Sequence, residues 1–210
     1  NSLGNSKALI VDTSVPTVTG VTSTTNNDSY KQGETIAITV AFSEVVNVTG
    51  TPQLTLETGG SDAVVDYSSG TGSNTLTFNY TIGAGHTSSD LDYESTSSLG
   101  LNGGAIKDAA LNAATLTLAS PGATNSLGAN TALIVDTSVP TISGVSLNAA
   151  NTELTVTFAE DVYNTNGGSG DLEVADFALS ISGGAAEVNA TPASIAKTAQ
   201  NISVLGSTLT

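Results

Sequence analysis

Hydrophobic and polar residues alternate with a period of two along much of the chain. Ile36, Ile38, Val40 and Phe42 are separated by Thr or Ala, so that these four side chains point to one face of an extended strand. The same alternation recurs at residues 76–82, 154–158 and 177–181. No stretch has the spacing of an amphipathic helix. The pattern therefore predicts an all-β protein.

Turn-forming residues divide the alternating stretches. Glycine pairs and Ser-Gly clusters, such as Gly59 with Gly60, separate shorter strands predicted at residues 17–21, 53–57, 63–66 and 115–118. About seven strands in about 120 residues are typical of an immunoglobulin-like Greek-key β-sandwich. The Cys pair and the Trp of true immunoglobulin domains are absent from this chain.

The chain also contains a duplication. Residues 1–21, NSLGNSKALIVDTSVPTVTGV, recur as residues 125–145, NSLGANTALIVDTSVPTISGV, with 16 of the 21 positions identical. Such self-similarity indicates a tandem array. We expect residues 1–12 to be the last strand of a preceding repeat plus its linker, residues 13–136 to be a complete sandwich, and residues 137–210 to be a second repeat, incomplete at its C-terminus. The fold class predicted is thus tandem immunoglobulin-like sandwiches joined end to end.

The strand at residues 8–11 has a second interpretation. It could complete the unfinished C-terminal repeat of another copy by strand addition, which would build a head-to-tail filament. Alternatively, the chain is an excerpt of a longer polypeptide, which would also explain a last strand at its start and an incomplete repeat at its end. Both interpretations stay open.

Three segments carry a resemblance to a known family. VDTSVPTV, YKQGETIAITVAFSEVVNVTGTPQLTL and the closing ALIVDTSVP resemble the bacterial immunoglobulin-like repeats of giant secreted adhesins and cell-surface proteins. The resemblance covers roughly residues 12–136, and residues 152–184 resemble a related repeat type. It implies an extracellular rod of sandwiches, often held straight by calcium.

The amino-acid composition limits the classes of partner that the chain can bind. The chain has 4 Lys plus Arg, 19 Asp plus Glu and a net charge of −15, so that it is poorly suited to bind nucleic acid or anionic lipid. The absence of Cys excludes disulfides and thiolate chemistry, and no apolar run is long enough to insert in a membrane. Divalent cations are the natural counterions.

Acidic residues are predicted to meet where the chain enters the complete domain. Strand directions bring the loop after the second strand and the loop before the last strand back to this pole, which places Glu44, Asp108 and Asn112 beside Asp12 of the connector. Calcium takes six to eight oxygen ligands. The matching set at the next junction is Asp136, Glu160 and Asp161.

A simpler interpretation of these acids also exists. Asp12 and Asp136 would only cap turns, while Glu44 and Glu160 would be solvated. Carboxylates crowded at one pole repel one another without a cation, and this repulsion favours a calcium site.

Three further acids, Asp90, Asp92 and Glu94, alternate along an extended stretch and are expected to point the same way. They could bind calcium, although the spacing of an EF-hand is absent. A solvated face is the interpretation that we favour for them.

Catalytic residues are scarce. His86 is the only imidazole and is expected to be an exposed loop residue, so the chain is predicted not to be an enzyme. A deep pocket formed by His86 and carboxylates would contradict this prediction. A carbohydrate-binding module is an alternative function, with tyrosines as stacking platforms: Tyr30, Tyr67, Tyr93 and Tyr163.

The sequence therefore predicts a structural spacer of an extracellular bacterial cell-surface protein, stiffened by calcium between domains. Its expected partners are neighbouring repeats or copies of itself, and a surface glycan or protein ligand.

Overall fold

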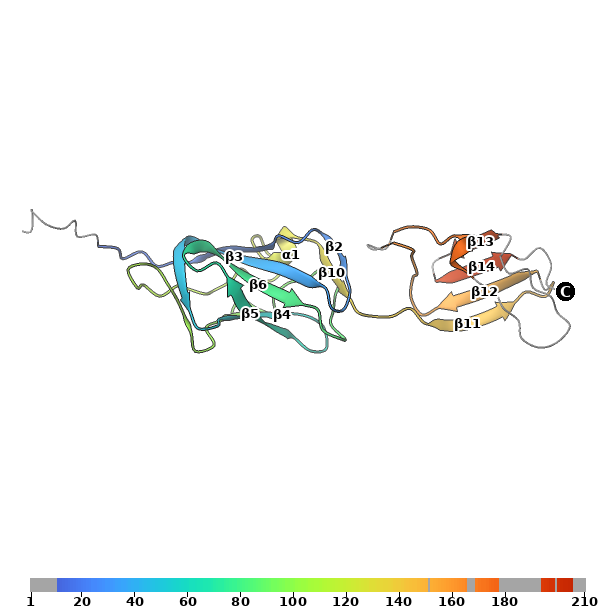
Figure 1. The fold of residues 1–210 in the computed structure, drawn as a ribbon, viewed down its shortest axis with the longest axis horizontal. Coiled ribbons are helices and arrows are strands. Elements are labelled where there is room, and N and C mark those ends of the chain that lie inside the picture. Colours follow the sequence, from blue (N-terminus) through green and yellow to red (C-terminus); the bar gives the residue numbers. More distant parts are fainter. Residues whose placement is uncertain (1–10, 151, 166–168, 178–193, 199, 206–210) are drawn as a thin grey trace, which may run out of the picture. The chain divides into compact units, whose positions relative to one another are not determined.

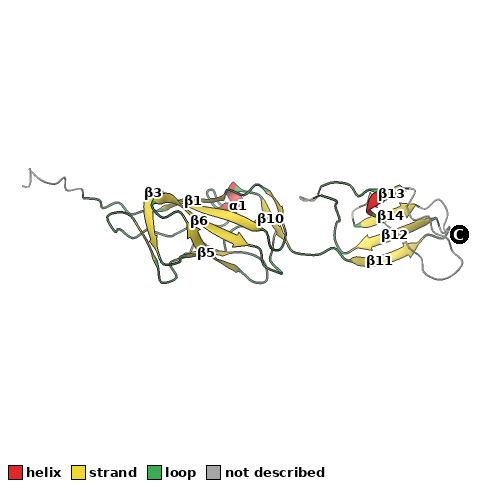
Figure 2. Cartoon of the chain, viewed as in Figure 1, coloured by secondary structure: helices red, strands yellow, loops and turns green. Residues whose placement is uncertain are grey.

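The computed structural model describes residues 11–150, 152–165, 169–177, 194–198 and 200–205. The described chain is nearly all β, and its sheets are largely antiparallel (Figure 2). It divides into two compact units, Asn1–Thr137 and Ser138–Thr210. The domain boundaries expected from the duplication stay a prediction. The predictions for residues 1–10 and 178–181 lie outside the described residues, so strand exchange through residues 8–11 stays a prediction.

The larger sheet of unit 1 contains seven strands (Figure 1). Its hydrogen-bonded order is β1 (Val18–Ser23), β3 (Thr35–Thr49), β6 (Ser73–Thr81), β5 (Ala63–Ser69), β4 (Gln53–Leu56) and β8 (Leu99–Gly100), and β9 (Ala105–Lys107) pairs with β3. All these pairs are antiparallel.

The smaller sheet of unit 1 places the exit of the chain. It consists of β2 (Asp28–Tyr30), β10 (Leu133–Asp136) and β7 (Thr87–Ser88). β10 is parallel to β2 and antiparallel to β7. The predicted closing strand of the complete repeat is therefore a strand of unit 1.

The alternating pattern explains the core of unit 1. Ile36, Ile38 and Val40 of β3 are fully buried, and they belong to the same hydrophobic cluster as Phe78 of the larger sheet and Leu133 of the smaller one. Both sheets thus contribute to a single core, because each places its apolar face inward. This arrangement is compatible with a β-sandwich.

Two local predictions for unit 1 were wrong. Residues 115–118 form no regular strand, and Thr115 makes only an isolated bridge to Thr17. A single helical turn, α1 (Leu127–Asn130), is present where no helix was expected. The side chain of Ser126 caps it by accepting a hydrogen bond from Ala129 N at 3.2 Å, which satisfies one of the free N–H groups of a helix start.

Unit 2 has a four-stranded sheet with the order β11 (Ile142–Leu147), β12 (Glu153–Phe158), β14 (Asn201–Leu205) and β13 (Ser194–Thr198), and a 3-10 turn, η2 (Val174–Asp176). Among its described residues, the buried hydrophobic side chains are those of Val162 and Ile202. Within the described chain, no helix has the length and apolar character needed to cross a membrane.

Candidate metal centre at the entry of unit 1

An irregularity in β3 positions Glu44. β3 pairs with β6 up to Ala41, and the pairing resumes only at Val46. The residues between them are not in register with β6, and β3 turns at this end of unit 1 (Figure 1). A bulge of this kind changes the direction of a side chain. Glu44, in the irregular stretch, is half-buried.

Strand register brings Asp108 close to Glu44. The far part of β3 pairs with β9, with Asn47 opposite Lys107. Asp108 directly follows β9, so the antiparallel register places it beside Val46, two residues from Glu44. Asp108 is only 3% exposed. A buried carboxylate needs compensating partners.

The entering segment brings Asp12 to the same place. Thr17 N donates to Ser43 Oγ at 3.0 Å, and Ser43 N donates to Thr17 O at 2.9 Å. These bonds fix the entering segment against the bend of β3. Asp12 is exposed and forms a local turn, because its Oδ1 accepts a hydrogen bond from Ser14 N at 2.9 Å.

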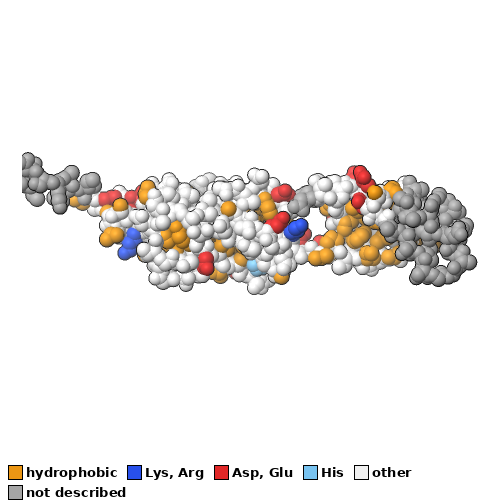
Figure 3. Space-filling model, in the orientation of Figure 1, with side chains coloured by type: hydrophobic (Ala, Val, Ile, Leu, Met, Phe, Trp, Pro, Cys, Tyr) orange, Lys and Arg blue, Asp and Glu red, His pale blue; other side chains and the backbone are white. Residues whose placement is uncertain are grey.

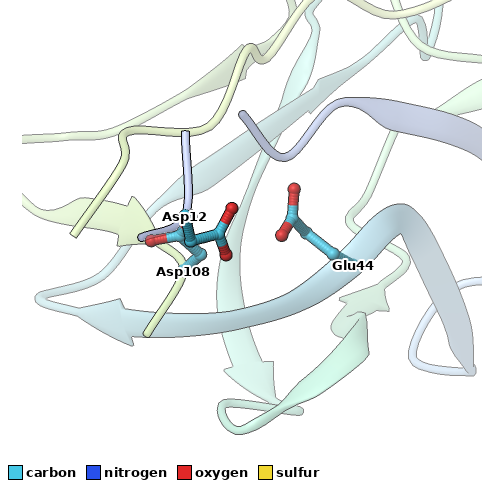
Figure 4. Close-up of side chains that lie close together, drawn as sticks. All are labelled: Asp12, Glu44 and Asp108. Carbon is cyan, nitrogen blue, oxygen red and sulfur yellow. The ribbon is translucent and has the colours of Figure 1, made fainter. Parts of the chain in front are cut away.

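The three carboxylates converge. One oxygen atom each from Asp12, Glu44 and Asp108 lies within 4.8 Å of the others, and the three side chains come from three separate segments (Figure 4). The three carboxylates predicted to meet at this pole therefore do so, and Asn112 lies beside them. It is the only such group of three among the described residues.

Asn112, the fourth predicted residue, donates hydrogen bonds to this cluster. Its Nδ2 donates to Asp108 Oδ2 at 2.7 Å and to Asp12 O at 3.2 Å, and its backbone N donates to Asp108 Oδ1 at 2.8 Å. The amide turns its NH₂ group to the carboxylate in this arrangement, and a role of Asn112 as an oxygen ligand stays a prediction. Asn112 positions Asp108, whose two oxygens each keep a lone pair for a cation.

The electrostatics of the cluster favour a cation. The pKa of Glu44 is raised above its usual value by desolvation first and then by the negative charges of Asp12 and Asp108. Both charges that raise the pKa of Glu44 thus belong to the other two carboxylates of the cluster. The donors are all oxygen atoms, the type that hard cations such as Ca²⁺ prefer, and Ca²⁺ completes its shell with water or carbonyl groups at about 2.3–2.6 Å.

Unit 2 repeats part of this local geometry. Val18 pairs with Phe42 in unit 1 and Ile142 pairs with Phe158 in unit 2, and in both strand pairs the register shifts immediately after these residues. Glu160 follows Phe158 at the same spacing as Glu44 follows Phe42.

The predicted second set remains a prediction. Asp136 is the last residue of β10 in unit 1, whereas Glu160 and Asp161 belong to unit 2.

The prediction of a solvated face for Asp90, Asp92 and Glu94 is wrong for Asp92. Asp92 is 9% exposed, and its carboxylate accepts hydrogen bonds from Tyr93 N and Gly122 N, both at 2.9 Å. The pKa of Asp90 is raised by burial and then by the charge of Asp92. Glu94 is exposed. Asp92 therefore ties the loop before α1 to the core.

His86 differs from the exposed loop residue that was expected. It is half-buried, its Nδ1 lies 2.8 Å from Tyr80 Oη, and Gly83 N donates to Nδ1 at 3.2 Å. The imidazole also stacks on the Tyr80 ring with 5.8 Å between centroids. The prediction failed because the pattern of residues gives no sign of these contacts, although both partners lie within six residues of His86.

Two of the four predicted sugar platforms are not free. Tyr93 is fully buried and its hydroxyl donates to Ala119 O at 2.7 Å. One face of the Tyr163 ring is occupied by Lys197 Nζ, 3.6 Å from the ring centroid, although the residue is 42% exposed. Tyr30 and Tyr67 remain partly exposed.

Fold and site together define an all-β protein with an oxygen-lined acidic centre at one end of its larger unit. Comparison of the chain with protein-family models, with curated proteins and with solved structures gives no match.

Proposed function

We propose that the chain is a structural spacer from an adhesin-like protein of a bacterial cell surface, built of immunoglobulin-like repeats in series, and that it is not an enzyme. In this proposal Asp12, Glu44 and Asp108 bind a calcium ion. The observation that carries it is the approach of their carboxylates to within 4.8 Å.

A cation at this position would fix the entering segment. Asp12 lies on the connector, whereas Glu44 and Asp108 belong to the body of unit 1. Without a cation the three negative charges repel one another, which favours conformations with Asp12 turned away. Shared coordination replaces this repulsion with attraction and narrows the range of connector positions.

The two copies of the connector sequence support a spacer. In the first copy, Asp12 meets the entry of unit 1. In the second copy, Asp136 pairs with Thr87, and Thr137 Oγ1 accepts from Gly85 N at 3.1 Å and donates to His86 O at 3.0 Å. Entry and exit lie at opposite ends of unit 1 (Figure 1). The same connector sequence thus makes contacts at the entry of a repeat in its first copy and at the exit of a repeat in its second copy.

Thermal unfolding of the 210-residue chain tests the metal site. Calcium in excess should raise the melting temperature of unit 1 relative to EDTA, because ligand binding to the folded state alone is stabilising. The Asp108→Asn variant should lose this response, and Asp28→Asn, an exposed acid outside the cluster, should keep it. Equal melting temperatures of the wild-type chain in calcium and EDTA would remove the metal from the proposal.

Small-angle scattering tests the spacer role separately. A spacer stiffened by calcium should have a larger maximum dimension in calcium than in EDTA. A calcium-dependent melting temperature with no change in dimension would keep the site and contradict the mechanical role.

A further inference from the structure

A groove in unit 1, outside the acidic cluster, arises where two strands separate. β5 pairs with β6 only from Tyr67 onward, while its first part pairs with β4. β6 beyond Phe78 continues to pair with β3 alone. Between the diverging strands lies a groove of about 610 Å³, lined by residues 62–68, by Asn79 to Thr81 and by His86.

Hydrogen bonds hold the polar groups of the groove in place. Asp66 Oδ1 accepts from Gln53 Nε2 at 2.8 Å, and Asn79 Nδ2 donates to Ser68 Oγ at 3.0 Å. These bonds leave Asp66 Oδ2 and Asn79 Oδ1 as acceptors for a ligand. Both residues are exposed, as a binding surface requires.

The His86 ring is fixed at the same groove. Because Gly83 N–H donates to Nδ1, the neutral imidazole carries its proton on Nε2 and can donate there. Gly83 lies directly against the ring, and a Cβ atom at this position would be 2.9 Å from Cε1. A glycine is therefore required for the ring to take this place.

The lining excludes some ligands. It contains the carboxylates of Asp62 and Asp66 and no Lys or Arg, so anionic ligands would be repelled. The edge of β6 left without a β5 partner, Asn79 to Thr81, is three residues long and offers few main-chain bonds to an added peptide strand.

The remaining chemistry matches a neutral polyol. The groove combines fixed acceptors, one imidazole donor and the partly exposed ring of Tyr67, and its volume is within the range of small-molecule sites, about 300–1,000 Å³. Both carboxylates are exposed to water, whereas a general acid in glycoside hydrolysis depends on an apolar setting. These features favour binding over catalysis.

We propose that the groove between β5 and β6 binds a neutral oligosaccharide, with Asp66 and Asn79 accepting hydrogen bonds from sugar hydroxyls and His86 Nε2 donating one. This function is additional to the spacer role and does not depend on the metal site. It gives the repeat a side surface that holds glycans.

Titration of the 210-residue chain with cellohexaose, mannohexaose, xylohexaose and hexagalacturonate tests the proposal, with saturation-transfer NMR and calorimetry as readouts. EDTA is present throughout, so that failure of the metal site does not affect the result. At least one of the three neutral hexasaccharides should bind, and hexagalacturonate should bind at least tenfold more weakly.

Variants locate the site. Asn79→Ala and Asp66→Ala should each weaken binding at least tenfold. His86→Asn should do the same, because the Asn amide can accept near the position of Nδ1 but has no donor at that of Nε2. Asn74→Ala, on an exposed residue of the same strand β6, is the matched control and should leave affinity unchanged. Circular dichroism checks that each variant is folded.

Three results would overturn the proposal. They are the failure of all three neutral hexasaccharides to bind, equal or tighter binding of hexagalacturonate, and equal loss of affinity in Asn74→Ala and Asn79→Ala. Release of shorter sugars from a neutral hexasaccharide would contradict a purely binding role.

Discussion

Two pairs of strands in this molecule start from nearly the same sequence. β1 follows the first copy of the connector and pairs with β3, and β11 follows the second copy and pairs with β12. Both have a Phe opposite the first strand residue and an irregularity before the following glycine, Gly20 or Gly144. The two pairs thus share a register, although β1 and β3 are connected through β2 whereas β11 and β12 follow each other in the chain.

Burial distinguishes the two strand pairs. Val21 is 1% exposed, but Val145, at the same position of the repeat, is 59% exposed. Phe42 is 2% exposed, while Phe158 is partly buried. Figure 3 shows hydrophobic side chains on the visible described surface of unit 2. The two pairs share their register, whereas burial depends on strands distant in sequence, such as β6 and β10 in unit 1.

The largest predicted difference is between the stability losses caused by replacing Phe42 and by replacing Phe158. Phe42→Ala should lower the free energy of unfolding of unit 1 by about 3–5 kcal/mol, because it opens a cavity in a packed core. Phe158→Ala should cost unit 2 less than about 2 kcal/mol, because its side chain is already partly exposed. Urea unfolding followed by amide NMR signals of each unit measures both. Equal losses would contradict the comparison.

The second prediction concerns calcium. At a free calcium concentration 100 times the dissociation constant, unit 1 should gain about 2.7 kcal/mol of stability, and Asp108→Asn should lose this gain. Glu160→Gln, at the position of Glu44 but in unit 2, should leave the calcium response of unit 1 unchanged. Urea unfolding in calcium and in EDTA gives the values, and a wild-type response in Asp108→Asn would exclude Asp108 as a ligand.

The third prediction is a pH dependence in EDTA. The folded-state pKa of Glu44 is raised, so the folded protein binds more protons than the unfolded one between the unfolded value and the raised value. Stability should therefore fall as pH rises through this window, and it should recover on acidification towards the unfolded pKa. Glu44→Gln should weaken this dependence, as measured by melting temperature between pH 4 and 7. If Glu44→Gln has the same pH dependence of melting temperature as the wild-type chain, the proposed repulsion between Glu44 and the other two carboxylates is contradicted.

The smallest predicted effect is at the turn that holds Asp108. Leu111 has φ = 73° and is 73% exposed, so it occupies the left-handed region at a cost of about 1 kcal/mol without compensating burial. Leu111→Gly should stabilise unit 1 by up to about 1 kcal/mol in urea unfolding. Leu101→Gly, at an exposed leucine that is not among the positive-φ residues, should destabilise it. A loss in Leu111→Gly equal to that in Leu101→Gly would exclude strain.

Much of the framework could be predicted from local sequence. The alternation from Ile36 to Phe42 predicts β3, because a period of two has one structural meaning. Strand direction predicts the return of Glu44 and Asp108 to Asp12, because it determines the pole at which each loop lies.

What could not be predicted depends on side-chain contacts that only the folded chain makes, whether the partners are close or distant in sequence. The orientation of the Asn112 amide follows from its bonds to Asp108 and to the connector. The ring of His86 is fixed by Tyr80 and Gly83, and the groove beside it follows from the separation of β5 and β6. The burial of Asp92 results from a loop about 30 residues away in sequence.

Calcium titration of the ¹⁵N-labelled chain by NMR tests the central claim most directly. The backbone amides of Ser14 and Asn112 donate to Asp12 and Asp108, so their signals report on the candidate centre itself. The account predicts saturable shifts of these two signals in the wild-type chain and their absence in Asp108→Asn. Unchanged Ser14 and Asn112 signals at saturating calcium would contradict it.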